Sequence, residues 1–177
     1  MQVTDEHYTK IVELTYPVWV RDYKQWTREV IDLTDQYPTI DTQLVLTLLS
    51  TWMVRVFYPN GTTVEELVAD IRERLDWVQF KGQSLKWAAE IALGDHTCRL
   101  QGDSGIIIIG QVALISSMLQ VSGDPTLTMV RGREQLLRLD DNSPVMVNLR
   151  RLLVGEAWAH AKLLEELVAA QQQGEPK

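Results

Sequence analysis

The apolar run from Ile106 to Val121 constrains the fold of this chain more than any other part of the sequence. The run opens with four consecutive isoleucines, and only four polar side chains interrupt it. It is shorter than the roughly 20 apolar residues that cross a bilayer, and it is too long for one strand. We therefore predict a helix over residues 105–121, buried on nearly all sides, in which Gly110 lets a neighbouring element approach closely.

A short β-hairpin is the alternative for the beginning of this run. The β-branched side chains of residues 106–109 suit a pleated surface. The polar turn at 102–105 could close a hairpin onto residues 97–101. The sequence leaves this hairpin, over residues 97–109, open beside the helix.

Helical patterns account for the rest of the chain. Apolar side chains recur every three or four residues, and residues that suit helix ends stand between the apolar segments. The predicted helices cover 5–35 (with a kink or a new start at Pro17), 41–57 (capped by Asp41), a segment from the Thr63–Glu66 capping box to Val78, 85–93 (capped by Ser84 and ended by Gly94), 105–121, a segment from the cap Asp124 to Leu139, and 144–172.

Together these helices predict a single all-α domain over residues 1–172, a bundle of six or seven helices followed by a polar tail at 173–177. The helices over 41–57 and 105–121 are apolar on most faces, so we expect them to form a buried central pair. A length of 177 residues with 45% hydrophobic and 23% charged side chains fits one such domain.

The chain is acidic, with 24 aspartates and glutamates against 17 lysines and arginines and a net charge of -7. Nucleic acids and anionic membrane surfaces attract basic proteins, so we expect neither as a partner. Cys98 is the single cysteine, which excludes an internal disulfide, and the N-terminal residues have no signal-peptide pattern. Both features favour a cytoplasmic protein.

Aromatic side chains form a stripe in the first predicted helix. Tyr16, Trp19, Tyr23 and Trp26 are spaced by three and four residues, so their rings share one helical face. Tyrosine and tryptophan dominate binding hot spots, so the stripe is a candidate surface for a partner protein or a flat ligand. The alternative is that the stripe packs into the core.

Arginines near the C-terminal end form the second candidate surface. Arg131 and Arg133 lie in the predicted helix after Asp124. If that helix packs antiparallel to the last one, these two side chains join one basic patch that binds an acidic partner; its other members are Arg138, Arg150 and Arg151. The alternative is a set of scattered surface arginines.

Glu156 and His160 lie one turn apart on the apolar seam of the last predicted helix. A carboxylate and an imidazole in this position could bind a divalent metal or act as acid and base. The alternative is a hydrogen-bonded pair at the margin of the seam. Further metal ligands would have to come from Glu90, Asp95, His96 or Cys98.

No nucleotide-binding loop or nucleophile motif occurs in the sequence. We therefore expect a soluble, non-enzymatic helical protein without a cofactor, which acts by binding another protein as a regulator, adaptor, chaperone or immunity-type inhibitor. A metal-dependent hydrolase that uses Glu156 and His160, or a small-ligand sensor with an aromatic pocket, is the alternative. The supply of apolar helix faces also predicts a homodimer.

Overall fold

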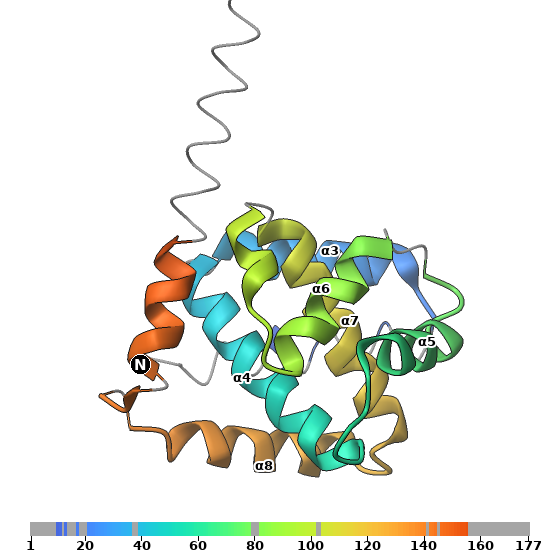
Figure 1. The fold of residues 1–177 in the computed structure, drawn as a ribbon. Coiled ribbons are helices and arrows are strands. Elements are labelled where there is room, and N and C mark those ends of the chain that lie inside the picture. The colour runs from blue at the N-terminus through green and yellow to red at the C-terminus, as the bar shows by residue number, and fades with distance from the viewer. Residues whose placement is uncertain are drawn as a thin grey trace, which may run out of the picture.

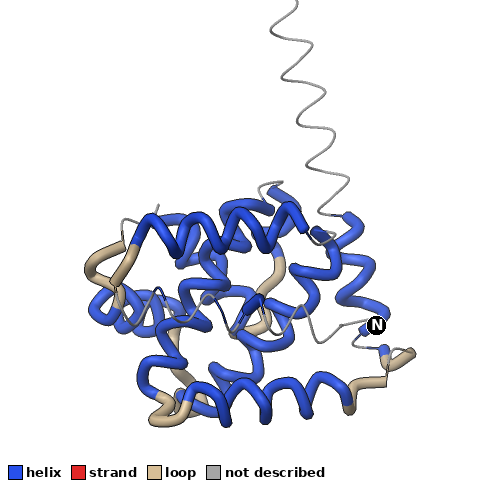
Figure 2. Tube along the Cα trace, turned by 180° about the vertical axis from the view of Figure 1, so that it is seen from behind, coloured by secondary structure: helices blue, strands red, loops and turns tan. Residues whose placement is uncertain are grey.

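The described part of the computed structural model consists of residues 10, 11, 13, 17, 21–36, 39–78, 82–101, 104–140, 142–144 and 146–155, and all of its regular elements are helices (Figures 1 and 2). The prediction of an all-α bundle is therefore confirmed. The helices are α3 (Tyr23–Gln36), α4 (Thr39–Phe57), α5 (Val64–Arg74), α6 (Gly82–Ala92), the short 3-10 helix η1 (Thr97–Gln101), α7 (Ser104–Val121) and α8 (Pro125–Leu137), followed by helical residues 146–155.

The alternative hairpin over residues 97–109 is wrong, because η1 and the beginning of α7 occupy this segment. A strand with one buried face would bury alternate side chains. Ile107 and Ile108 are adjacent in sequence, and both are buried. Continuous burial of this kind requires an element surrounded by others, and a helix satisfies its backbone hydrogen bonds internally in such a position.

The apolar helices α4 and α7 form the buried centre, as predicted. Twelve residues of α7 are buried, from Ile107 to Leu119 with one exception. The helix packs most extensively against α6 and next against α4 (Figure 1). Within the described residues α7 is the one helix with the length and apolar composition of a membrane span, and 67% of it is buried inside the protein. Its apolar surface is thus used largely in packing against neighbouring helices.

Gly110 brings α7 close to α6, as its position in the apolar run predicts. A Cβ atom at this residue would lie 2.0 Å from the carbonyl oxygen of Ser84. No side chain can occupy that space, because the obstacle is backbone. The absence of a side chain therefore sets the distance between the two helices.

The first predicted helix does not run unbroken from residue 5 to residue 35. Arg21 has a left-handed backbone conformation with φ of 54°, and α3 starts anew at Tyr23. The carboxylate of Asp22 accepts a hydrogen bond of 3.0 Å from the backbone N–H of Gln25, as an N-cap does. Pro17 is itself helical, and the break at Arg21 is a feature that the sequence did not predict.

Two predicted caps are confirmed and two are wrong. Thr63 and Glu66 form the capping box of α5, and Asp124 caps α8. Asp41 lies inside α4, which begins at Thr39, and Ser84 lies inside α6, which begins at Gly82. Ser84 is buried, so tertiary packing rather than its capping propensity determines its position.

The helix α8 lies across one end of the bundle, along the lower edge of Figure 1. It contacts mainly α4 and, to a smaller extent, α7. The helical residues 146–155 rise away from the end of α8 in both views and do not lie alongside it (Figures 1 and 2). The domain limits predicted at 172 and 173–177 lie outside the described residues.

Candidate functional site

The aromatic stripe contributes one exposed ring to the described surface. Trp26 is buried in the main core cluster, whereas Tyr23 is exposed. The two rings stack with their centroids 6.4 Å apart. Tyr16 and Trp19 lie outside the described residues. Trp26 therefore packs into the core, as the alternative interpretation of the stripe expects. Of the two described rings, Tyr23 is the one whose exposure allows contact with a partner.

The structure does not test the predicted metal pair. Glu156 and His160 are both outside the described residues. Among the described residues, no group of three or more His, Cys, Asp and Glu side chains could hold a metal ion. The four further ligands considered have other contacts: Asp95 accepts hydrogen bonds from Thr97, Glu90 pairs with Lys86, His96 accepts from Arg99, and the buried Cys98 thiol faces the carbonyl oxygen of Trp87.

Arg131 and Arg133 lie on different sides of α8. Residues two apart on a helix do not face the same direction, and Arg131 is exposed whereas Arg133 is half-buried. Arg150 and Arg151 lie on the helix that rises away from α8, where they border a separate shallow depression of about 370 Å³. Over the described residues 146–155, the last helix does not pack antiparallel along α8.

The outward side of α8 is nonetheless unusually apolar for a solvent-facing surface. Leu127, Val130 and Leu137 are 44%, 48% and 61% exposed. They share one side of the helix with charged residues, and we call this side the outer face of α8: Leu127, Val130, Arg131, Glu134, Leu137 and Arg138. The spacing of residues 127, 130, 134 and 137 is that of a helix-pairing seam.

The opposite side of α8 explains how the helix is held on the bundle. Met129, Gly132 and Leu136 are buried there. A Cβ atom at Gly132 would lie 2.7 Å from Leu49 and 3.2 Å from the ring of Trp52, both on α4. This inner side packs on α4, whereas the apolar residues of the outer face remain exposed in the described structure.

A cleft of about 480 Å³ opens beside the C-terminal end of α8. Its walls come from α4, from the turn after α6, from the end of α8 and from residues 148–152 of the last described helix. The larger apolar side chains of the walls are Leu48, Trp52, Leu136, Leu149 and Leu152. A concave apolar space of this size is typical of small-molecule sites.

A buried arginine stands behind the polar wall of this cleft. Arg99 is fully buried, and its guanidinium donates hydrogen bonds to Gln43 over 2.6 Å, to the hydroxyl of Thr47, and to Nδ1 of His96 over 3.3 Å. The amide of Gln111 also donates to the Thr47 hydroxyl, over 2.9 Å. Burial of a charged group is costly unless it is hydrogen-bonded, and these described acceptors contribute to that compensation.

Two residues of this cluster, Thr47 and His96, also line the cleft. Burial lowers the pKa of His96, and the nearby positive charge of Arg99 lowers it further. The imidazole is therefore neutral at pH 7. Because Nδ1 accepts from Arg99, the proton of the neutral ring is on Nε2.

No sequence motif indicates this cluster, but isolated polar residues in apolar surroundings are a signal for it. Arg99 is the single lysine or arginine between Lys86 and Arg131, and it lies a few residues before the apolar run that begins at Ile106. Gln111 interrupts that run, and Thr47 interrupts the apolar sequence of α4. Isolated polar residues in apolar segments are rarely buried without partners.

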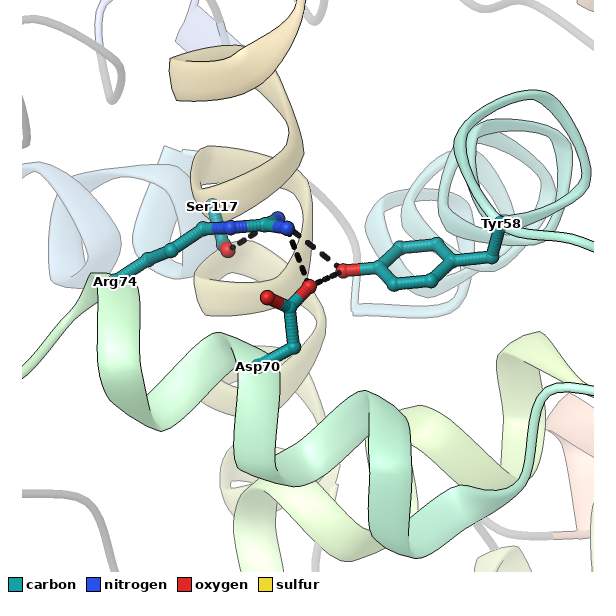
Figure 3. Close-up of polar contacts among 4 residues, drawn as sticks. All are labelled: Tyr58, Asp70, Arg74 and Ser117. Atoms are coloured by element: carbon teal, nitrogen blue, oxygen red, sulfur yellow. Dashed lines mark hydrogen bonds and ion pairs between the residues drawn. The ribbon is translucent and has the colours of Figure 1, made fainter.

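A second polar cluster joins α4, α5 and α7 (Figure 3). The hydroxyl of Tyr58 donates to Asp70, which also pairs with Arg74. Arg74 in turn donates to the Tyr58 oxygen over 3.2 Å and to Ser117 over 3.4 Å. Burial and the bond to Asp70 raise the pKa of Tyr58 to about 12, which makes it a poor acid or base near neutral pH. This cluster is suited to holding three helices together.

No protein-family model, curated protein or solved structure matches the chain.

Proposed function

We propose that this protein is a non-enzymatic helical protein that acts by binding protein chains, in the class of regulators, adaptors, chaperones or immunity-type inhibitors. The outer face of α8 is the surface that binds. The proposal rests on one observation, the three exposed apolar side chains Leu127, Val130 and Leu137 on a helix that is already docked by its other side. Exposed apolar groups that gather on one face indicate a protein interface.

A second copy of the chain is the partner that best fits this face. When two copies of α8 pack antiparallel about a two-fold axis near residue 132, Leu127 of each copy lies opposite Leu137 of the other. The same arrangement sets Glu134 of each copy opposite Val130 of the other, one position from Arg131, with which the carboxylate can pair. The face is thus complementary to itself in both apolar groups and charge, as a two-fold interface requires.

The charge of the outer face favours this pairing locally. The face carries two arginines and one glutamate, whereas the whole chain has a net charge of -7. A surface without the acidic excess reduces the repulsion between two acidic molecules. Ionic pairs at the rim of such an interface add specificity and depend on salt.

Sedimentation equilibrium of the purified chain tests the proposal. We expect a dimer at tens of micromolar, roughly the range in which a functional dimer is populated. Val130→Glu places a charge in the centre of the face and should give a monomer with unchanged helical circular dichroism. Val56→Glu is the matched control, because Val56 is 56% exposed on α4, away from α8's outer face, and should leave the dimer intact. A monomeric wild type, or a dimer that both variants retain, would contradict the proposal.

A further inference from the structure

The cleft beside α4 and α8 has features that the proposed protein-binding surface does not use. We propose that it binds a small monocarboxylic acid with an apolar body, such as a medium-chain or aryl-substituted acid. This inference is independent of the outer face of α8, because the cleft is lined by the other side of that helix.

The apolar walls determine the body of the ligand. Trp52 and Leu48 of α4 face the same space as Leu136, Leu149 and Leu152 from the other side of the cleft. An alkyl chain or a ring between these walls would be removed from water. This burial of apolar area would supply most of the binding free energy. The volume of about 480 Å³ accommodates a ligand of that size.

The buried arginine determines the hydrogen-bonding character of the head group. The hydroxyl oxygen of Thr47 accepts from Arg99 and from Gln111, so both of its lone pairs are engaged. Its own hydrogen remains for a donor bond. Nδ1 of His96 is likewise engaged by Arg99, and Nε2–H is a donor. Two polar groups of the cleft wall are therefore set as donors, and they require an acceptor from the ligand.

The charge of the lining determines that this acceptor is an anion. Arg55 is an exposed cation in the wall of the cleft, and among the described residues that line it there is no aspartate or glutamate. One exposed cation with two neutral donors matches the single charge and the two oxygens of a carboxylate. A dianionic phosphate would need more cations, and an amine would meet donors and positive charge.

Calorimetric titration with matched ligands tests this inference. Octanoate, octanamide and octylamine share their alkyl chain and differ in the head group. We expect octanoate to bind wild type about tenfold more tightly than octanamide, because the difference is one charge-assisted contact, and octylamine not to bind. Phenylpropionate and its amide should show the same preference with an aromatic body.

Two variants in the cleft and one control variant outside it locate the binding site. Arg55→Gln should lower the affinity for octanoate about tenfold and bring it near that of octanamide. Arg28→Gln, at an exposed arginine of α3 that lies neither in the cleft wall nor on the outer face of α8, should change neither affinity. Leu152→Trp fills the cleft and should abolish binding of both ligands. Thermal unfolding and circular dichroism check that each variant is folded.

Equal binding of octanoate and octanamide, no binding of octanoate to wild type, or binding that survives Leu152→Trp in a folded variant would each overturn the inference. Loss of the acid preference in Arg28→Gln as well as Arg55→Gln would do the same, because it would indicate attraction by overall charge. The oligomeric state of the Val130→Glu variant is measured separately, so failure here leaves the proposed interface of α8 untouched, and the reverse is also true.

Discussion

At the scale of single residues, the buried Arg99 organises more of this molecule than its position in a short 3-10 helix indicates. Its described partners Gln43 and Thr47 lie 56 and 52 residues earlier in the chain. A guanidinium offers five donors in a fixed plane, so it can hold side chains from several elements in one arrangement. The cluster accounts for two polar side chains, Thr47 and Gln111, at the centre of two apolar helices.

Tyr58 gives a prediction for alkaline pH. Its folded pKa is about 12, above the ordinary value of 10.0, because of burial and the hydrogen bond to Asp70. The unfolded chain therefore releases the phenolic proton first. The stability that Tyr58 contributes is complete below pH 10 and is lost as the pH rises towards about 12.

Tyr58→Phe should cost about 1–2 kcal/mol of unfolding free energy at neutral pH, because the hydrogen bonds of the hydroxyl to Asp70 and from Arg74 are both lost. Between pH 9 and pH 12 the gap between wild type and variant should close. Urea unfolding at a series of pH values measures this. Tyr23→Phe is the control, since Tyr23 is exposed, and it should keep the pH dependence of wild type. A gap that stays constant with pH would contradict the assignment of the raised pKa to Tyr58.

At the scale of elements, the sequence predicted those helix ends that local chemistry determines. The Thr63–Glu66 capping box and the Asp124 cap act through residues three or four positions away, so their pattern is visible in the sequence. Ser84 has the same local propensity, but it lies buried inside α6 against Gly110 of α7. That contact depends on the packing of two helices, which local pattern does not contain.

The candidate site was predictable to a smaller extent for the same reason. Arg131 on α8 was identified from the sequence, and it does belong to the outer face. The cleft could not be identified, because four segments between residues 47 and 152 line it, and they are brought together only by the fold. The exposed apolar row of α8 could not be predicted either. Apolar residues occur on both sides of this short helix, and that pattern is typical of a helix buried in the core.

The contact of α6 with α7 gives a prediction at this scale. Gly110→Ala should lower the unfolding free energy by about 3 kcal/mol, because the new methyl group meets the Ser84 carbonyl oxygen and the helices must separate. Gly155→Ala is the matched control. It lies in a helical segment with no atom within 4 Å of the new Cβ, so it should be neutral or slightly stabilising. Chemical denaturation of both variants measures the difference; equal stability would contradict the close approach.

At the scale of the whole molecule, α7 raises the question of which environment its apolar surface needs. By length and composition it would suit a bilayer, yet most of its surface contacts α4, α5 and α6. Burial by other helices and burial by lipid select the same amino acids, so composition alone does not separate them. The two environments differ in where a helix tolerates a charge. A helix in a soluble bundle tolerates a charge on its water-facing side, whereas a helix in a membrane does not tolerate one on its lipid-facing side.

Two positions of the isoleucine run, Ile107 and Ile109, therefore distinguish the two environments. Ile107 is 0% exposed and Ile109 is 38% exposed. We expect Ile107→Asp to cost more than about 4 kcal/mol, since an unpaired charge is placed in the core, and to abolish cooperative unfolding. Ile109→Asp should cost about 1 kcal/mol, mainly through helix propensity, and both wild type and this variant should purify without detergent with helical circular dichroism. If α7 crossed a membrane with Ile109 towards lipid, Ile109→Asp would be as damaging as Ile107→Asp, and wild type would partition with membranes.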